Sequence, residues 1–231
     1  MLFVRSLALF ACFIPLFGQT AQEKDKGQNL ADGVLGVTVL REQPWTPPTA
    51  EQRWQVYKLR SFTGPGMYIR TVATSLTDQK ENSPAAWGQG WGSFGKRLGN
   101  NYATFQLIDG AEMGLSAMAG YDPRYVQSRD TGAWKRVGHA VAFNFVTFDN
   151  KGKTVLNWPK LVAAYGVGML ASTYTPGMKW SAEGLRMGTA QVSFGMVSDL
   201  VKEFTPDLLK KLRRKKTPAT APTPSGIAPA K

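Results

Sequence analysis

The sequence predicts a mainly α-helical protein: a compact bundle of about five to six glycine-rich helices with an extended N-terminal arm and a disordered C-terminal tail. Two observations favour this fold class. Apolar residues recur three and four positions apart through the middle of the chain, as they do on one face of a helix. Glycines recur four positions apart in the same region. Hydrophobic residues make up 43% and charged residues 19% of the 231 residues, which suits one globular domain with tails.

The stretch from Trp87 to Gly120 has the densest glycine pattern, and we expect it to form the central helix, or helix pair, of the bundle. Residues four apart lie on one helix face, where glycines let a second backbone approach closely. The pairs are Gly88/Gly92, Gly95/Gly99, Gly110/Gly114 and, later in the chain, Gly184/Gly188. Two interpretations stay open: a water-soluble bundle with internal glycines, or a bundle that inserts into or lies against a membrane.

Residues 1–21 have the pattern of a secretory signal peptide. Arg5 precedes an apolar run from Leu7 to Phe17, and small residues follow it. An uncleaved membrane anchor is the alternative. The only cysteine, Cys12, lies inside this segment, so cleavage would leave a mature protein without disulfides. The sequence therefore predicts an exported protein of the periplasm or cell envelope.

Residues 22–48 are expected to form the extended arm, because glycines and prolines interrupt any regular apolar pattern there. The apolar residues between Val34 and Leu40 would either pair as one short strand or pack on the body. The helical domain is expected to follow over residues 49–209.

Caps and breakers set the expected helix boundaries. Thr49 and Gln52 fit a capping box at the start of the first helix, and Gly64-Pro65-Gly66 ends it. Further helices are expected over 67–79, from Ser83-Pro84 onward, over 102–119 with Gly120 as C-cap, over 134–148, from Asn157 to Thr173, and from Ser181 to an interruption at Pro206.

Two segments allow a second interpretation. Residues 143–156 contain the alternating run from Phe143 to Phe148, so a hairpin is the alternative to the favoured helix and turn. Leu161 to Met178 contains no charged residue, and its 18 residues reach the lower limit for a membrane span. Since Pro176-Gly177 ends that helix early, a buried core helix is favoured over a span.

Glu112 and His139 are the two residues that suggest chemistry. Glu112 lies among apolar positions with Asp109 one turn earlier, and a buried carboxylate needs a partner, for which Arg97, Arg124, Arg129 and Arg136 are candidates. His139 is the only histidine, so histidine-pair zinc motifs are excluded. Structural roles are favoured for both, and the sequence assigns no catalytic residue, no metal site and no cofactor.

Positive charge marks the candidate binding residues. Arg124 lies in the turn Asp122-Pro-Arg-Tyr125, which is either an anion-binding loop or, as favoured, a structural latch. The chain carries a net charge of +12, and its densest basic run belongs to the expected disordered tail, 210–231: Lys210, Lys211, Arg213, Arg214, Lys215 and Lys216. Such a run suits anionic lipid or a cell-wall polymer. Nucleic acid is not expected for an exported protein. A protein partner, or self-association through the glycine faces, stays open as a further interpretation.

Several motifs occur together in order: TAEQRW at Thr49–Trp54, GQGWGSFGKRLG at Gly88–Gly99, YDPRY at Tyr121–Tyr125, TYTP at Thr173–Pro176 and VKEFTPDL at Val201–Leu208. Over roughly Thr49 to Leu212 this pattern resembles an uncharacterised family of exported bacterial proteins. The resemblance implies export and a helical fold. It implies no activity and no functional residue.

The sequence thus favours a non-catalytic, exported, envelope-associated protein that contacts anionic membrane or wall polymer through its basic end. Two alternatives remain. One is an envelope-acting hydrolase that uses Glu112 and His139, with paired carboxyl groups as in glycoside hydrolysis. The other is a carrier for an apolar ligand bound between the helices.

Overall fold

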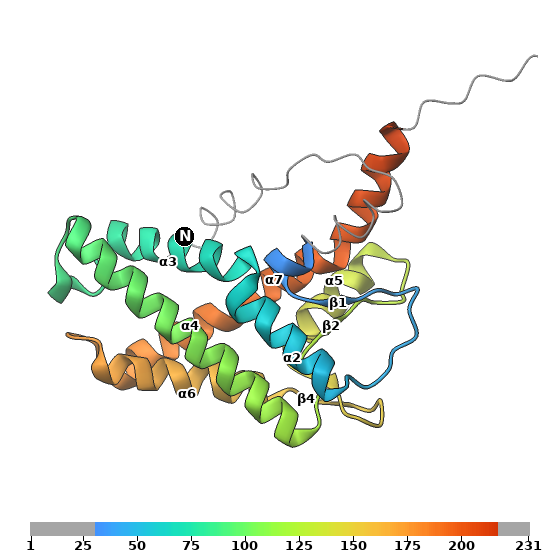
Figure 1. The fold of residues 1–231 in the computed structure, drawn as a ribbon, viewed down its shortest axis with the longest axis horizontal. Coiled ribbons are helices and arrows are strands. Elements are labelled where there is room, and N and C mark those ends of the chain that lie inside the picture. Colours follow the sequence, from blue (N-terminus) through green and yellow to red (C-terminus); the bar gives the residue numbers. More distant parts are fainter. Residues whose placement is uncertain (1–30, 217–231) are drawn as a thin grey trace, which may run out of the picture.

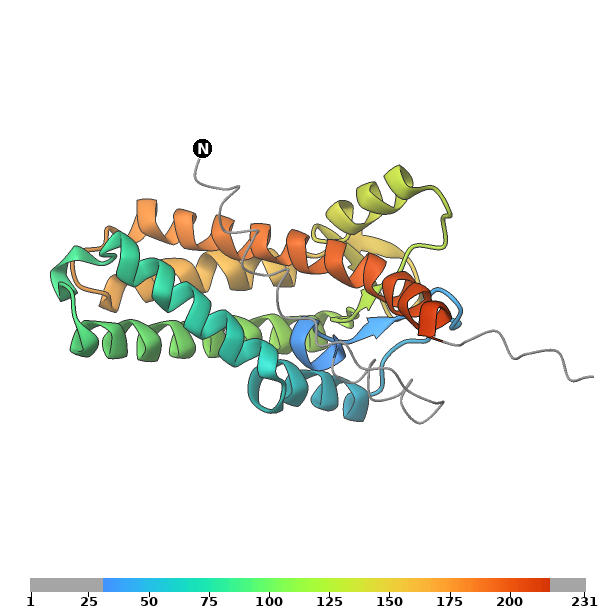
Figure 2. The same ribbon diagram turned by 90° about the horizontal axis from the view of Figure 1, so that it is seen from above.

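The structure, a computed structural model, describes residues 31–216, without the side chains of Glu183, Leu209, Lys210 and residues 212–216. Within that range the protein is mainly α-helical, as the sequence predicts. The longest helices are α3 (Pro65–Glu81), α4 (Trp91–Ala119), α6 (Trp158–Tyr174) and α7 (Trp180–Lys216). Helix α3 packs on α4, α4 on α6 and α6 on α7, while the short elements gather at one end (Figures 1 and 2). The predicted signal peptide, 1–21, lies outside the described residues.

Helix α2 (Ala50–Lys58) begins as the sequence predicts. The Thr49 hydroxyl accepts a hydrogen bond from the Gln52 amide at 3.2 Å, and the Gln52 side chain accepts one from the Thr49 amide at 3.0 Å. The helix then widens into a π-helical turn, η1 (Leu59–Thr63), and Gly64 ends it. Pro65 is the first residue of α3, a position where its missing N–H costs nothing.

The N-terminal arm is docked on the body through glycines. Residues 31–35 form a short helical segment, where the sequence predicted extended chain. A Cβ atom at Gly64 or Gly66 would collide with the carbonyl oxygens of Gly33 and Val34, so these glycines admit the arm backbone. Strand β1 (Thr38–Val39) then pairs in parallel with β2 (Tyr125–Val126), which realises the strand pairing expected for the arm.

Helix α4 is one continuous helix of 29 residues, so of the two expectations, a central helix or a helix pair, the structure has the single helix. The segment that begins at Pro84 forms only a single turn, η2 (Ala85–Trp87). Gly120 caps α4 in the left-handed conformation (φ 70°, ψ 29°), as predicted. The expected close contact at the α4 glycines is absent among the described residues: the space beside Gly92, Gly95, Gly99 and Gly114 is open.

The close glycine contact lies instead between α6 and α7. A Cβ atom at Gly168 would lie 2.8 Å from the carbonyl oxygen of Gly184, and one at Gly184 would lie 2.7 Å from the Met169 Cα atom. At Gly188 the space is filled by the ring of Tyr165. The Gly184/Gly188 pair therefore does what the sequence predicted for glycines four apart.

The helix favoured over 134–148 ends early. Helix α5 (Ala133–Ala142) is followed by an antiparallel hairpin of β3 (Val146–Phe148) and β4 (Thr154–Leu156), so the favoured helix and turn is wrong and the hairpin alternative is right. The Asp149 carboxylate accepts from the amides of Lys151 and Lys153 at 2.8 and 2.9 Å and shapes the turn. Alternating apolar residues and this side-chain bond outweigh the helical pattern.

Helix α7 runs on through Pro206 and the basic residues to Lys216. The expected interruption at Pro206 is wrong, and so is the assignment of 210–216 to a disordered tail. In Figure 1 the C-terminal part of α7 projects beyond the bundle. The rest of the expected tail, 217–231, lies outside the described residues.

The interior of the bundle is rich in polar side chains. Arg97 of α4 is 1% exposed and donates to the carbonyl oxygens of Ser83 at 2.7 Å and Pro84 at 3.2 Å. Asn101, one turn further along α4, donates to Ser75 and Asp78 of α3 at 3.1 and 2.8 Å. Apolar packing is concentrated at the other end, around Tyr125, Ala140 and Phe143. Hydrogen bonds and ion pairs therefore contribute much of the contact between the long helices.

Alanine in place of a closely packed glycine and alanine in place of an open glycine should change the stability in opposite directions. Gly184→Ala places a methyl group against the α6 backbone and should lower the free energy of unfolding by about 1–3 kcal/mol. Gly95→Ala on the open face of α4 adds only helix propensity and should raise it by up to about 1 kcal/mol. Urea denaturation of both variants measures the difference, and a larger loss in Gly95→Ala would contradict the packing described.

Candidate functional site

Glu112 lies in a buried ion network that joins α4 to η1 and α3. Arg60 Nη2 lies 2.5 Å from Glu112 Oε2 and 2.9 Å from Asp109 Oδ1. Arg70 Nη2 donates to Asp109 Oδ2 at 3.0 Å. The buried carboxylate thus has the partner that it requires, but the partner is Arg60 and none of the four arginines suggested by the sequence.

The protonation state of Glu112 follows from this contact. Burial would raise the pKa of the Glu112 carboxyl, but the Arg60 guanidinium outweighs burial and holds the pKa below its usual value. The general acid of a glycoside hydrolase needs the opposite shift. Glu112 is therefore a carboxylate fixed in an ion pair, and its geometry gives the hydrolase alternative no support.

His139 lies on α5, in the cluster of aromatic rings at the end of the bundle. Its Nε2 atom is 2.9 Å from the carbonyl oxygen of Val126, and its ring packs against Tyr125 and Phe143. The residues bonded to His139 and those bonded to Glu112 do not overlap in the described part of the chain. The two residues are therefore not assembled into one catalytic group.

Arg124 has the structural role in the Asp122–Tyr125 turn that the sequence analysis favoured over anion binding. Its guanidinium donates to both carboxylate oxygens of Asp122, with Nη2 to Oδ2 at 2.8 Å, and to the carbonyl oxygen of Thr46 at 2.7 Å. Trp45 Nε1 also donates to Asp122, at 2.9 Å. The DPRY turn thus holds the end of the arm against the body, and these contacts occupy the Arg124 guanidinium.

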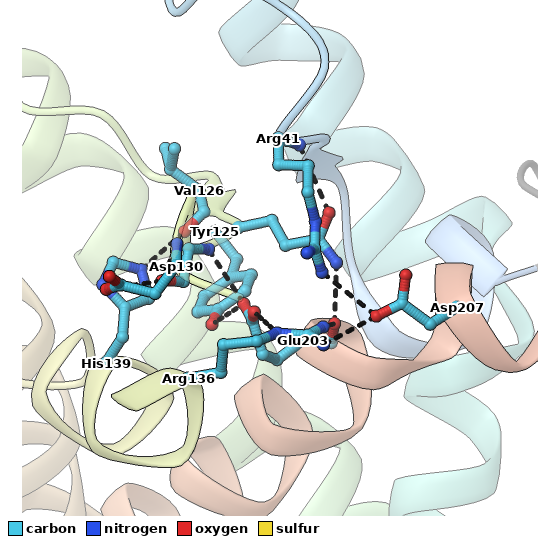
Figure 3. A network of polar contacts seen from close by, with 10 residues as sticks. Arg41, Tyr125, Val126, Asp130, Arg136, His139, Glu203 and Asp207 are labelled. Carbon is cyan, nitrogen blue, oxygen red and sulfur yellow. Dashed lines mark hydrogen bonds and ion pairs between the residues drawn. The ribbon is translucent and has the colours of Figure 1, made fainter. Parts of the chain in front are cut away.

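Glu203 of α7 is the centre of a second buried network, shown in Figure 3. Its carboxylate accepts from the Tyr125 hydroxyl at 2.8 Å and from Arg136 Nε at 2.7 Å. Arg136 also pairs with Asp207, which Arg41 of the arm reaches at 3.1 Å. Burial and then the Glu203 carboxylate raise the pKa of Tyr125, so the phenol stays a donor. The network ties the arm, β2 and α5 to α7.

The outer face of α6 carries no charge. Exposed residues recur four apart along the helix, and we call them the α6 stripe: Trp158, Val162, Gly166, Leu170 and Tyr174. Val162 and Leu170 are 51% and 53% exposed. The neighbouring helix α4 also exposes small and apolar residues: Gly92, Gly95, Gly99, Ala103, Leu107, Gly114 and Met118. The helix predicted as buried is therefore buried on one side only.

The basic candidate residues stand at the projecting end of α7. Lys210, Lys211, Arg213, Arg214, Lys215 and Lys216 all have helical backbone, and Lys211 is exposed. No acidic residue follows Asp207. This end of the chain therefore concentrates positive charge on a helix and not on an irregular tail.

Two other structural features are absent from residues 31–216. No group of three or more His, Cys, Asp or Glu side chains is arranged to hold a metal ion. Among the same residues, none of the helices combines the length and the hydropathy that a membrane crossing requires.

Comparison of the chain with protein-family models, with curated proteins and with solved structures gives no match. The resemblance to exported bacterial proteins stays a prediction. The function is therefore inferred from the residues of this chain alone.

The ion pairs of Glu112 and Asp199 predict acid sensitivity. Burial opposes ionisation of Asp199, but Lys202 and Lys160 outweigh it, so its pKa, like that of Glu112, is lowered by folding. Their contribution is full above the unfolded pKa values, which are near 3.8 and 4.5, and is lost as the pH falls through the lower folded values. We expect the free energy of unfolding to decrease when the pH is lowered below about 4.5.

The variant Glu112→Gln tests whether the acid sensitivity arises from the ion pair of Glu112. It leaves Arg60 and Arg70 to share the one carboxylate of Asp109, so one buried cation lacks a countercharge; this should cost about 3 kcal/mol at pH 7 and flatten the acid dependence. Urea titrations between pH 3 and pH 7 measure both effects, with Glu81→Gln at an exposed position as control. An unchanged acid slope in Glu112→Gln would contradict the assignment.

Proposed function

We propose that this protein is a non-catalytic, envelope-associated protein that binds the surface of an anionic membrane. The α6 stripe would lie against lipid, and the basic end of α7 would contact the headgroups. The observation that carries the proposal is the α6 stripe, an exposed and charge-free helix face on a bundle whose buried charged groups form ion pairs.

The stripe fits the interfacial region of a bilayer. An apolar helix face typically sinks about 5–10 Å into the boundary between headgroups and acyl chains. From Trp158 to Tyr174 the stripe is about 24 Å long at 1.5 Å per residue. Residues four apart turn by about 40° per step around a helix, so Val162, Gly166 and Leu170 form the part of the stripe that faces lipid most directly. Trp158 stands at the N-terminal end of the stripe, and such a ring favours the interface because it combines an apolar body with a polar group.

The contacts of α6 with its neighbours hold the helix with the stripe facing away from the bundle. The face opposite the stripe is fixed on α7 by the contacts at Gly168 and Tyr165, and Thr104 of α4 lies 3.2 Å from the Tyr174 hydroxyl. The helix is thus held rigidly with its apolar residues outward. Exposing Val162 and Leu170 to water has an unfavourable free energy, which contact with lipid would remove.

Charge favours an anionic surface as the partner. The chain carries +12, and six cations stand between Lys210 and Lys216. Each lysine or arginine near an anionic leaflet contributes about 1 kcal/mol of attraction, which acts over roughly a Debye length. The predicted export of the chain would bring this surface to the envelope.

Vesicle flotation tests the proposal with the full chain. The protein should bind vesicles of phosphatidylglycerol and phosphatidylethanolamine more tightly than neutral phosphatidylcholine vesicles. Val162→Glu with Leu170→Glu should lower the bound fraction at least tenfold, because two charges would have to enter the interface.

The matched control is Leu76→Glu on α3, at an apolar side chain that is 56% exposed but lies outside the α6 stripe. It should bind like the unchanged protein. Equal losses in the control and the double variant would contradict the proposal. So would binding to isolated wall polymer without binding to vesicles, or a stable dimer that Leu170→Glu dissociates.

A further inference from the structure

The N-terminal arm bridges α3 and α7. Helix α3 packs on α4, and α7 packs on α5 and α6, while arm residues 33–37 lie between α3 and α7 (Figures 1 and 2). On the α3 side, a Cβ atom at Gly66 would collide with the carbonyl oxygen of Val34. On the α7 side, the Ser198 hydroxyl donates to the carbonyl oxygen of Leu35 at 3.3 Å. The backbone of the arm therefore contacts both helices.

A partly enclosed cavity of about 120 Å³ lies beneath this part of the arm. Its charged lining, apart from the Asp122–Arg124 ion pair, comes from η1, α3, α4, α6 and α7: Arg60, Arg70, Glu112, Lys160, Asp199 and Lys202. The side chains of Arg60, Lys160 and Lys202 are 23%, 18% and 13% exposed. The arm thus covers ionic groups that water already reaches in part.

The arm itself contributes little to the apolar core. Within residues 31–47, only Gly33 and Val39 are buried. Strand β1 has two residues, and a pair of strands that short is marginally stable without further contacts. Segments with few buried apolar contacts open at a lower free energy than the whole domain. The attachment of the arm therefore depends largely on polar contacts.

One of these contacts is an ion pair near the surface. Arg41 Nη2 lies 3.1 Å from Asp207 Oδ2, and the two side chains are 20% and 41% exposed. Arg136 Nη1 lies 2.7 Å from the same Asp207 oxygen. When Arg41 leaves, Asp207 keeps its partner on α5, so no carboxylate is left unpaired.

The second attachment has the same property. Trp45 Nε1 donates to Asp122 at 2.9 Å, and Arg124 donates to the arm carbonyl oxygen of Thr46 at 2.7 Å. Asp122 and Arg124 also bind each other, with Nη2 to Oδ2 at 2.8 Å. Their ion pair stays intact without the arm. Both attachments can therefore break without leaving a buried charge alone.

We infer that arm residues 31–47 form a lid, which leaves the body as one unit while the helical bundle stays folded. Opening turns the cavity between α3 and α7 into a cleft that solvent and its solutes can enter. Hydration of the ionic lining offsets part of the lost arm contacts, because charged groups are stabilised by water. The lid lies apart from the α6 stripe and opens without lipid.

Native-state hydrogen exchange of the full chain, without lipid, tests the inference. The Gln127 amide of the body donates to the arm carbonyl oxygen of Val39 at 3.0 Å, so its exchange reports opening of the arm. After correction for intrinsic rates, it should exchange about 100-fold or more faster than the Ala164 amide inside α6, with a much smaller dependence on urea. Equal rates and equal urea dependence would overturn the inference, since the arm would then leave only on global unfolding.

Arg41→Gln removes one attachment of the lid. It should speed exchange at Gln127 about tenfold and leave Ala164 unchanged. Lys96→Gln makes the same change of charge at an exposed position of α4 and should alter neither amide. Equal acceleration of Gln127 and Ala164 in Arg41→Gln would contradict a lid, because the arm would then stabilise the bundle as a whole.

Oxidation of Met67 shows whether the cavity itself opens. This side chain of α3 lines the cavity and is 2% exposed, whereas Met113 of α4 is 9% exposed and is not part of the lining. In dilute hydrogen peroxide, read by peptide mass spectrometry, Met67 should form its sulfoxide about tenfold faster in Arg41→Gln than in the unchanged chain, with no change at Met113. Unchanged oxidation of Met67 would mean that β1 frays over a cavity that stays covered, and would overturn the inference.

Discussion

The pairing of buried carboxylates with arginines is the constraint on which the rest of the structure depends. Asp109 and Glu112 on α4 are held by Arg60 and Arg70, and Glu203 on α7 is held by Arg136. Removing one member of such a pair leaves the other charged and desolvated, which is far more costly than losing one apolar contact. The positions of η1, α3 and α5 on the bundle are therefore set by charge as well as by apolar packing.

The packing of α6 has a consequence for the surface. Its buried side consists mainly of small residues such as Ala163, Gly168 and Ala171, whereas the larger apolar residues Val162 and Leu170 are exposed. The open glycines of α4 extend the uncharged surface beside it. A membrane interface suits such a distribution, because there the apolar residues leave water and the inner ion pairs stay intact.

Local signals predicted local structure well. The Thr49 capping box, the Gly120 C-cap and the Gly184/Gly188 contact were predictable because each depends on a few neighbouring residues. The close contact predicted at the α4 glycines was wrong, because four-residue spacing shows that residues share a helix face but not that another helix covers that face. Glu203 was missed because its partners lie 67 to 78 positions away in the chain. Arg60 was missed for the same reason, as it lies 52 positions from Glu112.

The most direct test of the central claim is the depth of the α6 stripe in a bilayer. A spin label at Val162→Cys, in a chain whose only other cysteine is replaced by Cys12→Ser, reports contact with oxygen in lipid and with a water-borne relaxant. On anionic vesicles we predict a gain in oxygen contact and a loss of aqueous contact, with no such change for a label at Leu76→Cys. A Val162 label that stays fully accessible to the aqueous relaxant would contradict the account.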